Sequence, residues 1–299
     1  MAYQVAMSIG GVRIEIACAD APILGEHEAH YRPFVRPAEQ VPSPADIHIR
    51  LVLGNLPDTA AMQEVFNTDE SWALLSEGER RFIVLQPAAF DAPLWVARFD
   101  DGPANITIFC GPRLVQAKDG RACVSNPVRY PLDQILLMYF LAPRRGALIH
   151  AAGVGIGGRG FIFPGRSGAG KSTLTRQLAH RPDLHLLSDD RIIIRKCEND
   201  YRAYGTPWPG EANVATNDSL PLRGIVFIRH GPENTIREMS NQTALENLLP
   251  VTSIPWYDRD VMLHILSFCE EMFSDIPAYE LHFKPTIEVA DVLAQLVSG

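Results

Sequence analysis

Hydrophobic residues in the first part of the chain recur at every second position, which is the period of a half-buried β-strand. This alternation runs through residues 3–18 and is interrupted at Gly10-Gly11, which predicts a β-hairpin. Further strands are predicted at 47–53, 81–85, 94–99 and 105–110. We therefore expect residues 1–129 to form an antiparallel, β-rich N-terminal domain. This domain either binds a partner or substrate or packs on the rest of the chain.

Beyond residue 130, apolar segments of helical length alternate with short apolar runs. Helices are predicted at 130–141, 172–180, 245–249, 259–273 and 287–297. Strands are predicted at 147–156, 160–164, 185–188, 192–194, 224–228 and 279–283. The pattern predicts a mixed α/β domain over residues 130–299, in which the strands at 160–164 and 185–188 are close neighbours.

Composition and charge narrow the class of protein. The chain has 299 residues, of which 46% are hydrophobic and 21% charged, as is ordinary for a globular protein. The formal net charge of −8 disfavours nucleic acid or an anionic membrane as the main partner. Five scattered cysteines without a C-x-x-C spacing are typical of reduced thiols. With neither a signal-peptide pattern nor an apolar run of membrane-spanning length, we expect a cytoplasmic protein, and we further expect a homo-oligomer.

One stretch matches G-x-x-x-x-G-K-[ST], the phosphate-binding P-loop. Its residues are Gly165, Arg166, Ser167, Gly168, Ala169, Gly170, Lys171, Ser172 and Thr173. A P-loop wraps a polyphosphate with backbone N–H groups and needs glycine where a Cβ would block the approach. The predicted strand before the loop and helix after it also aim a helix dipole at the phosphates. The sequence therefore predicts that the loop and Lys171 bind ATP, with Mg²⁺ on the Ser172 hydroxyl.

Candidate catalytic carboxylates follow the P-loop helix. Asp189 and Asp190 end a short apolar strand, where a P-loop enzyme needs an acidic group beside Mg²⁺ and the γ-phosphate. One of them can orient metal-bound water while the other accepts a proton, unless the pair is a solvated turn or a helix cap. His150 either lies near the phosphates or is a core histidine. Glu211 is either a further carboxylate on the metal side or a surface turn residue.

The order of three segments carries a resemblance to a known family. His-Ala-Ala-Gly-Val at 150–154, the P-loop, and Ser-Asp-Asp at 188–190 resemble the kinase domain of HPr kinase/phosphorylase. That domain is itself similar to the ATP-binding part of ATP-dependent phosphoenolpyruvate carboxykinase. The resemblance covers residues 147–228 and implies an HPr-kinase-type nucleotide domain behind the β-rich front half. It further implies a kinase that uses ATP and Mg²⁺ to phosphorylate a serine of a protein or peptide.

The resemblance also implies roles for individual residues. Lys171 and Ser172 bind the triphosphate and Mg²⁺, and His150 lies near the phosphates. Asp189 is the base that accepts a proton from the attacking hydroxyl, and Asp190 is the acid on the metal side.

Three other functions remain open at this point. One is a kinase for a small hydroxylated metabolite such as free serine, although the chain has no recognisable arginine-rich lid. Another is a nucleotide-binding regulatory protein, against which the intact Lys171, Ser172 and Asp pair weigh. Carboxykinase chemistry would need a second metal site and a substrate-binding arginine that the sequence does not identify. Thr173 and residues 207–211 depart from the family, because an acidic residue and the phosphorylase signature commonly stand there.

Overall fold

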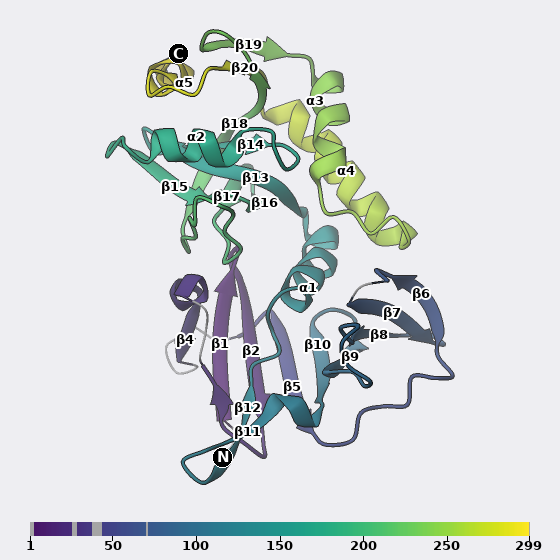
Figure 1. The fold of residues 1–299 in the computed structure, drawn as a ribbon. Coiled ribbons are helices and arrows are strands. Elements are labelled where there is room, and N and C mark those ends of the chain that lie inside the picture. Colours follow the sequence, from purple (N-terminus) through teal and green to yellow (C-terminus); the bar gives the residue numbers. More distant parts are fainter. Residues whose placement is uncertain (1–2, 26–28, 38–43, 70, 299) are drawn as a thin grey trace. The chain divides into compact units, whose positions relative to one another are not determined.

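Figure 1 shows the computed structural model of the protein, which describes residues 3–25, 29–37, 44–69 and 71–298. The chain divides into two compact units, and each is described by itself. The first unit comprises Met1–Ser8, Val12–Glu28 and Val35–Phe140. The second unit comprises Ile9–Gly11, Ala29–Phe34 and Leu141–Gly299. Two short segments from the N-terminal region therefore belong to the second unit.

A nine-stranded sheet forms most of the first unit, in the order β4-β1-β2-β5-β10-β9-β8-β7-β6. In chain order its strands are β1 (Tyr3–Ile9), β2 (Val12–Cys18), β4 (Val35–Pro37), β5 (Ile47–Leu53), β6 (Gln63–Asn67), β7 (Trp72–Glu77), β8 (Arg80–Leu85), β9 (Trp95–Asp101) and β10 (Asn105–Cys110). A smaller sheet contains β3 (Ile23–Leu24), β11 (Val115–Lys118) and β12 (Arg121–Ser125). Alternate residues of β2 are buried, as the period of two predicts.

The predicted hairpin over residues 3–18 is confirmed. Gly10 and Gly11 join β1 to β2 with φ angles of 60° and 70°, as a type I′ turn requires at both central positions. The prediction of an antiparallel sheet is wrong at one strand, because β5 runs parallel to both of its neighbours, β2 and β10. A parallel pair needs a long crossover, and the chain between β2 and β5 supplies one. Alternation marks a strand but carries no information on the direction of its partner.

The second unit is built on an eight-stranded mixed sheet, which agrees with the predicted α/β class. Its order is β14-β13-β16-β17-β18-β20-β19, with β15 paired to β13 and a further pairing between β14 and β18. The strands are β13 (Gly146–Ile156), β14 (Arg159–Pro164), β15 (Leu184–Ser188), β16 (Arg191–Cys197), β17 (Asp200–Tyr204), β18 (Ser219–His230), β19 (Thr235–Met239) and β20 (Ala278–Phe283). Because β14 also pairs with β18, the strands β14, β13, β16, β17 and β18 form a closed circuit. β14, β18 and β20 run parallel to one another.

Helices pack on this sheet and fix the edge at which β14 ends. They are α2 (Lys171–Leu178), α3 (Asn241–Leu248), α4 (Arg259–Asp275) and α5 (Val289–Ser298). Phe161 and Phe163 of β14 belong to one buried cluster with Leu174 and Leu178 of α2 and Leu293 of α5. Burying a large apolar side chain contributes about 1.5–3 kcal/mol. This packing therefore holds the start of α2 firmly at the end of β14.

Helix α1 (Leu132–Leu141) matches the helix predicted at 130–141. All of it except its last residue belongs to the first unit, whereas the sequence places the domain boundary between residues 129 and 130. The helix is buried on nearly all sides, and even its Asp133 is 0% exposed. Because the helix has no polar face, its sequence pattern does not indicate which domain it packs on. The domain division at 129 and 130 stays a prediction.

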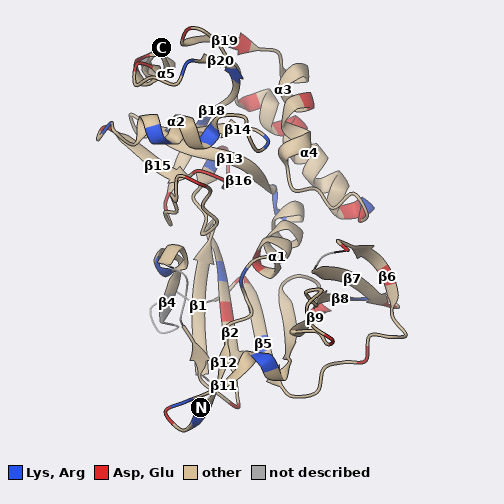
Figure 2. Ribbon diagram, in the orientation of Figure 1, with Lys and Arg blue, Asp and Glu red and all other residues tan. Residues whose placement is uncertain are grey.

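Charged residues are distributed over both units. In Figure 2, acidic and basic residues are interspersed along the ribbon of each unit. Within the part of the chain that the structure describes, no helix combines the length and the apolar character that crossing a bilayer requires.

Candidate functional site

The glycine-rich loop, residues 165–170, connects β14 to α2. Its last residue, Gly170, is the N-cap of α2 and has a φ of 97°, a conformation that residues with a Cβ rarely adopt. Gly170 has no side chain that could accept a hydrogen bond, so the first N–H groups of α2 need another acceptor. These donors lie at the positive end of the helix dipole. The loop thus lies between a strand and a helix, as the sequence predicts, and its identity as a phosphate-binding P-loop stays a prediction.

Lys171 is the first residue of α2, and it is only 5% exposed. Its Nζ donates hydrogen bonds to the carbonyl oxygens of Gly165 at 2.8 Å and Arg166 at 3.2 Å. Burial lowers the pKa of the Lys171 ammonium, and the negative charge of Asp190 offsets only part of this effect. The ammonium is thus held inside the loop by neutral carbonyl groups, with Asp190 acting on it through its charge.

Asp190 and His150 form a hydrogen-bonded pair beside the loop. Nε2 of His150 lies 2.9 Å from Oδ1 of Asp190, and Oδ2 lies 3.5 Å from Nε of Arg191. Burial raises the pKa of Asp190, but the hydrogen bond from His150 and the charges of Arg191 and Lys171 outweigh it. The pKa of Asp190 therefore lies below its usual value. Asp190 is ionised at neutral pH, and 31% of its side chain is exposed.

Backbone hydrogen bonds fix this pair relative to the loop. The N–H of Gly165 donates to the carbonyl oxygen of His150 at 3.1 Å, and the N–H of Ala151 donates to that of Asp190 at 2.9 Å. β13 pairs with β14 and also with β15, so a single strand separates the loop strand from the strand before Asp189. The prediction that these two strands are close neighbours is confirmed. The structure thus brings His150, Asp190 and Lys171 together from three separate elements.

Asp189 has a different environment from its neighbour. Its side chain is 1% exposed, and its Oδ1 accepts hydrogen bonds from the N–H groups of Gly210 at 2.9 Å and Val214 at 3.1 Å. Its Oδ2 accepts a third, from the N–H of Ala212 at 2.7 Å. A carboxylate has about four lone-pair positions. With three of them used by the backbone, Asp189 is suited to holding a loop in place.

The loop that encloses Asp189, residues 205–216, is anchored by further contacts. The hydroxyl of Thr206 donates to the carbonyl oxygen of Arg191 at 2.7 Å. A Cβ on Gly210 would lie 2.8 Å from Oδ2 of Asp189, so glycine is required there. The sequence does not predict the hydrogen bonds of this loop to Asp189. The available signal was the glycine of the Pro-Gly pair, which marks a close approach of backbone to another group.

Two predicted metal ligands, Ser172 and Glu211, lie in different surroundings. Oε2 of Glu211 lies 3.2 Å from Nη2 of Arg176, and the Glu211 side chain is 81% exposed. Ser172 is the second residue of α2 and is partly buried. Among the described residues, no group of three or more His, Cys, Asp or Glu side chains is arranged for a metal ion. Mg²⁺ in nucleotide sites needs one or two protein oxygens besides phosphate and water, and the Ser172 hydroxyl is of the right kind.

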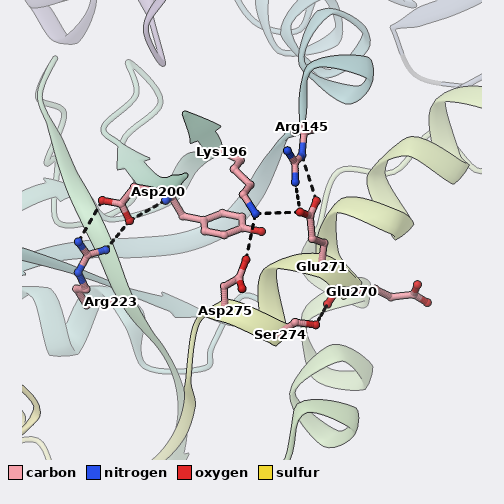
Figure 3. A network of polar contacts seen from close by, with 9 residues as sticks. Arg145, Lys196, Asp200, Arg223, Glu270, Glu271, Ser274 and Asp275 are labelled. Carbon is pink, nitrogen blue, oxygen red and sulfur yellow. Dashed lines mark hydrogen bonds and ion pairs between the residues drawn. The ribbon is translucent and has the colours of Figure 1, made fainter. Parts of the chain in front are cut away.

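A second polar cluster in the same unit contains a different kind of lysine (Figure 3). We call it the Lys196 cluster, and it comprises Lys196, Glu271, Asp275 and Arg145. Nζ of Lys196 donates to Oε1 of Glu271 at 2.9 Å and to Oδ2 of Asp275 at 3.1 Å. Arg145 also pairs with Glu271. The hydrogen bond to Asp275 raises the pKa of the Lys196 ammonium. The positive charge of this lysine is therefore balanced by the carboxylates of its own cluster.

Comparisons with known proteins found a distant structural similarity. No protein-family model and no curated protein matches the chain. Among solved structures, the HPr(Ser) kinase/phosphatase from Coxiella burnetii is similar at 14% sequence identity and a TM-score of 0.30, covering 50% of this chain and 88% of that chain. This distant structural neighbour is a kinase/phosphatase. A similarity this low does not show that the chain belongs to its family.

Proposed function

We propose that the protein is an ATP- and Mg²⁺-dependent phosphotransferase whose glycine-rich loop holds the triphosphate. The observation that carries this proposal is the buried ammonium of Lys171, which donates to two neutral groups, the carbonyls of Gly165 and Arg166. Burial has already removed most of the water from this charge, so an anion that reaches it gains a strong interaction. The unpaired N–H groups at the start of α2 favour the same ligand.

The Ser172 hydroxyl is the residue that we propose for holding Mg²⁺. Bound Mg²⁺ would neutralise charge on the β- and γ-phosphates. Glu211 lies at the surface and pairs with Arg176, so we assign it no role in holding the metal.

Phosphoryl transfer leaves the protein mainly positioning and charge stabilisation to supply. The acceptor oxygen attacks the γ-phosphorus, the bond from phosphorus to the bridging oxygen of ADP breaks, and the acceptor proton passes to a carboxylate. We propose Asp190 for that carboxylate, because it is ionised, partly exposed and near Lys171. His150 holds Asp190 in place through its 2.9 Å contact.

This division of labour differs from the one that the family resemblance implies, in which Asp189 is the base. Three backbone N–H groups already occupy the carboxylate of Asp189, which leaves little capacity for a substrate proton. We propose instead that Asp189 is a positioning residue. By fixing residues 205–216, Asp189 keeps the next residue in the chain, Asp190, directed toward the glycine-rich loop.

We propose a serine hydroxyl of a protein or peptide as the acceptor. The support is the order of residues 150–154, the P-loop and residues 188–190, which resembles a family of protein-serine kinases. Residues 207–211 lack the signature associated with phosphorylase activity, and Gly210 among them donates its N–H to Asp189. We therefore propose transfer from ATP to serine as the main direction of the reaction.

Transfer of radiolabelled γ-phosphate from ATP tests this proposal in a bacterial extract that is separated into proteins and small molecules. We expect labelled phosphoserine in the protein fraction, abolished by Lys171→Ala. Label confined to small molecules would identify a metabolite kinase. Nucleotide binding without transfer to either fraction would identify a regulatory protein, and absence of binding would refute the proposal.

A further inference from the structure

A cavity of about 530 Å³ adjoins the glycine-rich loop. Its lining includes Pro164 to Ala169, the end of β18, and residues from the last turn of α3 onward. Cavities that bind small molecules commonly have volumes of about 300–1,000 Å³. The cavity lies entirely within the second unit, and the roles proposed so far use only its loop wall.

The topology of the sheet sets the position of this cavity relative to the phosphates. β13 borders one edge of β14, and β15 with Asp190 follows on that side. β18 borders the other edge of β14, in parallel. The last paired residues are Ile162 of β14 and Ile225 of β18. Beyond them β18 continues to His230, whereas β14 ends at Pro164 and the glycine-rich loop begins. A nucleotide whose γ-phosphate faces Lys171 and Asp190 therefore has its remaining length available to extend toward β18.

The cavity walls combine an apolar surface with hydrogen-bonding groups, as a nucleoside requires. Phe227 and Ile228 of β18, with Pro250 and Val251, supply apolar surface. Glu246 lies in the last turn of α3, where the helix dipole also places negative charge. The Glu246 carboxylate can accept hydrogen bonds from the amino group of a base or from the hydroxyls of a ribose.

Arg166, Arg229 and His230 line the cavity, and hydrogen bonds hold the guanidinium of Arg229 in place. Its Nε lies 3.3 Å from Oε2 of Glu280, and its Nη2 donates to Oδ1 of Asn247 at 2.9 Å. Two acceptors from two different elements thus fix the plane of the guanidinium, and its side chain stays 48% exposed. A guanidinium fixed in this way can stack on the face of a base and lose little freedom in doing so.

We propose that this cavity holds the nucleoside of the bound nucleotide and that the guanidinium of Arg229 contacts it. This inference rests on the proposed binding of triphosphate to the loop, and it adds the part of the ligand that the loop does not recognise. Lys171 would then determine affinity for the phosphates, and Arg229 would determine the preference for a nucleotide over bare polyphosphate.

The test compares two ligands by titration calorimetry in Mg²⁺, ATP and inorganic tripolyphosphate. Arg229→Met should weaken ATP binding about tenfold and leave tripolyphosphate within about twofold. Asn247→Ala, which loosens Arg229, should act in the same direction with a smaller effect. Arg223→Met is a matched control, because Arg223 lies on the same strand, is 41% exposed and pairs with Asp200. It should change neither affinity.

The outcomes separate this inference from the function on which it rests. Equal wild-type affinity for ATP and tripolyphosphate would overturn the inference and leave the loop assignment standing. So would an Arg229→Met variant that binds both ligands as the wild type does, or one that loses both equally. A wild type that binds neither ligand would overturn the proposed function, and the inference with it.

Discussion

Lys171 and Lys196 lie in the same unit and use the same ammonium group in opposite ways. Lys196 donates to two carboxylates, and the hydrogen bond to Asp275 raises its pKa (Figure 3). Lys171 donates to two carbonyl oxygens, and burial lowers its pKa. The first charge is balanced by the folded chain, whereas the second is offset only in part, by the charges of Asp190 and Asp189. An unbalanced buried charge is a sign of a binding site, and a balanced network is a sign of a structural one.

The same contrast separates the adjacent carboxylates Asp189 and Asp190. The carboxylate of Asp189 accepts hydrogen bonds from three backbone N–H groups of one loop. Asp190 bonds to the side chain of His150 and remains partly exposed. Sequence alone treats the two residues as equivalent, and the hydrogen-bond partners distinguish them.

The largest effect is expected from Lys171→Met, which removes the unbalanced charge. Transfer should fall by about 100- to 1,000-fold. The wild type should gain about 2.7 kcal/mol of stability from ATP and Mg²⁺ at one hundred times Kd, and the variant should lose this gain. Without nucleotide, its unfolding midpoint should be no lower than that of the wild type, because a poorly balanced buried charge has been removed. Thermal unfolding with and without nucleotide measures both quantities, and equal nucleotide shifts in the two proteins would refute the loop assignment.

A large loss of stability is expected from Asp189→Asn. An amide offers one acceptor oxygen and two donors where three N–H groups now need acceptors, so the variant should lose about 2 kcal/mol. Urea unfolding measures the loss. Asp190→Asn is the matched control, since it lies one residue away and accepts from one side chain. An equal loss in both variants would contradict the positioning role of Asp189.

The His150–Asp190 pair predicts a change in the pH profile. The pKa of Asp190 is depressed in the fold, so its ionised form contributes stability above the unfolded value of about 3.9 and loses this contribution as pH falls through the folded pKa. In His150→Ala the hydrogen bond that lowers the pKa of Asp190 is lost, whereas the burial that raises this pKa remains. The acid limb of the transfer rate should therefore move to higher pH.

A rate profile of His150→Ala against pH checks this direction. His150→Gln keeps an N–H donor and should retain more of the wild-type profile. An acid limb that stays in place, or moves to lower pH, would show that His150 does not hold Asp190.

The smallest functional effect is expected from Lys196→Met. Removing this cation leaves Glu271 and Asp275 without their shared partner, so the unfolding midpoint should fall. Nucleotide affinity and transfer should stay at wild-type values, since the cluster balances its own charges. A loss of ATP affinity comparable with that of Lys171→Met would erase the distinction between the two lysines.

Local patterns predicted much of the fold. Strand β10 occupies the predicted residues 105–110, and the glycine pair at 10–11 forms the predicted turn. These succeed because alternation and turn chemistry are properties of neighbouring residues. Strand β17 was missed because Tyr201 and Ala203 are its only fully buried positions, too few to show a period. Strand β19 was missed for a similar reason, since none of its residues is fully buried.

The candidate site was predicted in part for the same reason. The loop glycines, Lys171 and the position of Asp190 follow from motif and spacing. The hydrogen bonds of Asp189 to residues 210–214 join segments that are distant along the chain, so no local pattern announces them. The partner of Glu211 is likewise set by where α2 lies in the fold.

The central claim is that Asp190 receives the proton while Lys171 holds the phosphates, and single-turnover transfer by Asp190→Asn tests it most directly. A positioned carboxylate contributes about 100- to 10,000-fold. We predict that Asp190→Asn binds ATP with nearly wild-type affinity and transfers its γ-phosphate at least about 100-fold more slowly. A variant that transfers at the wild-type rate, or that is slow only because it no longer binds ATP, would contradict the assignment.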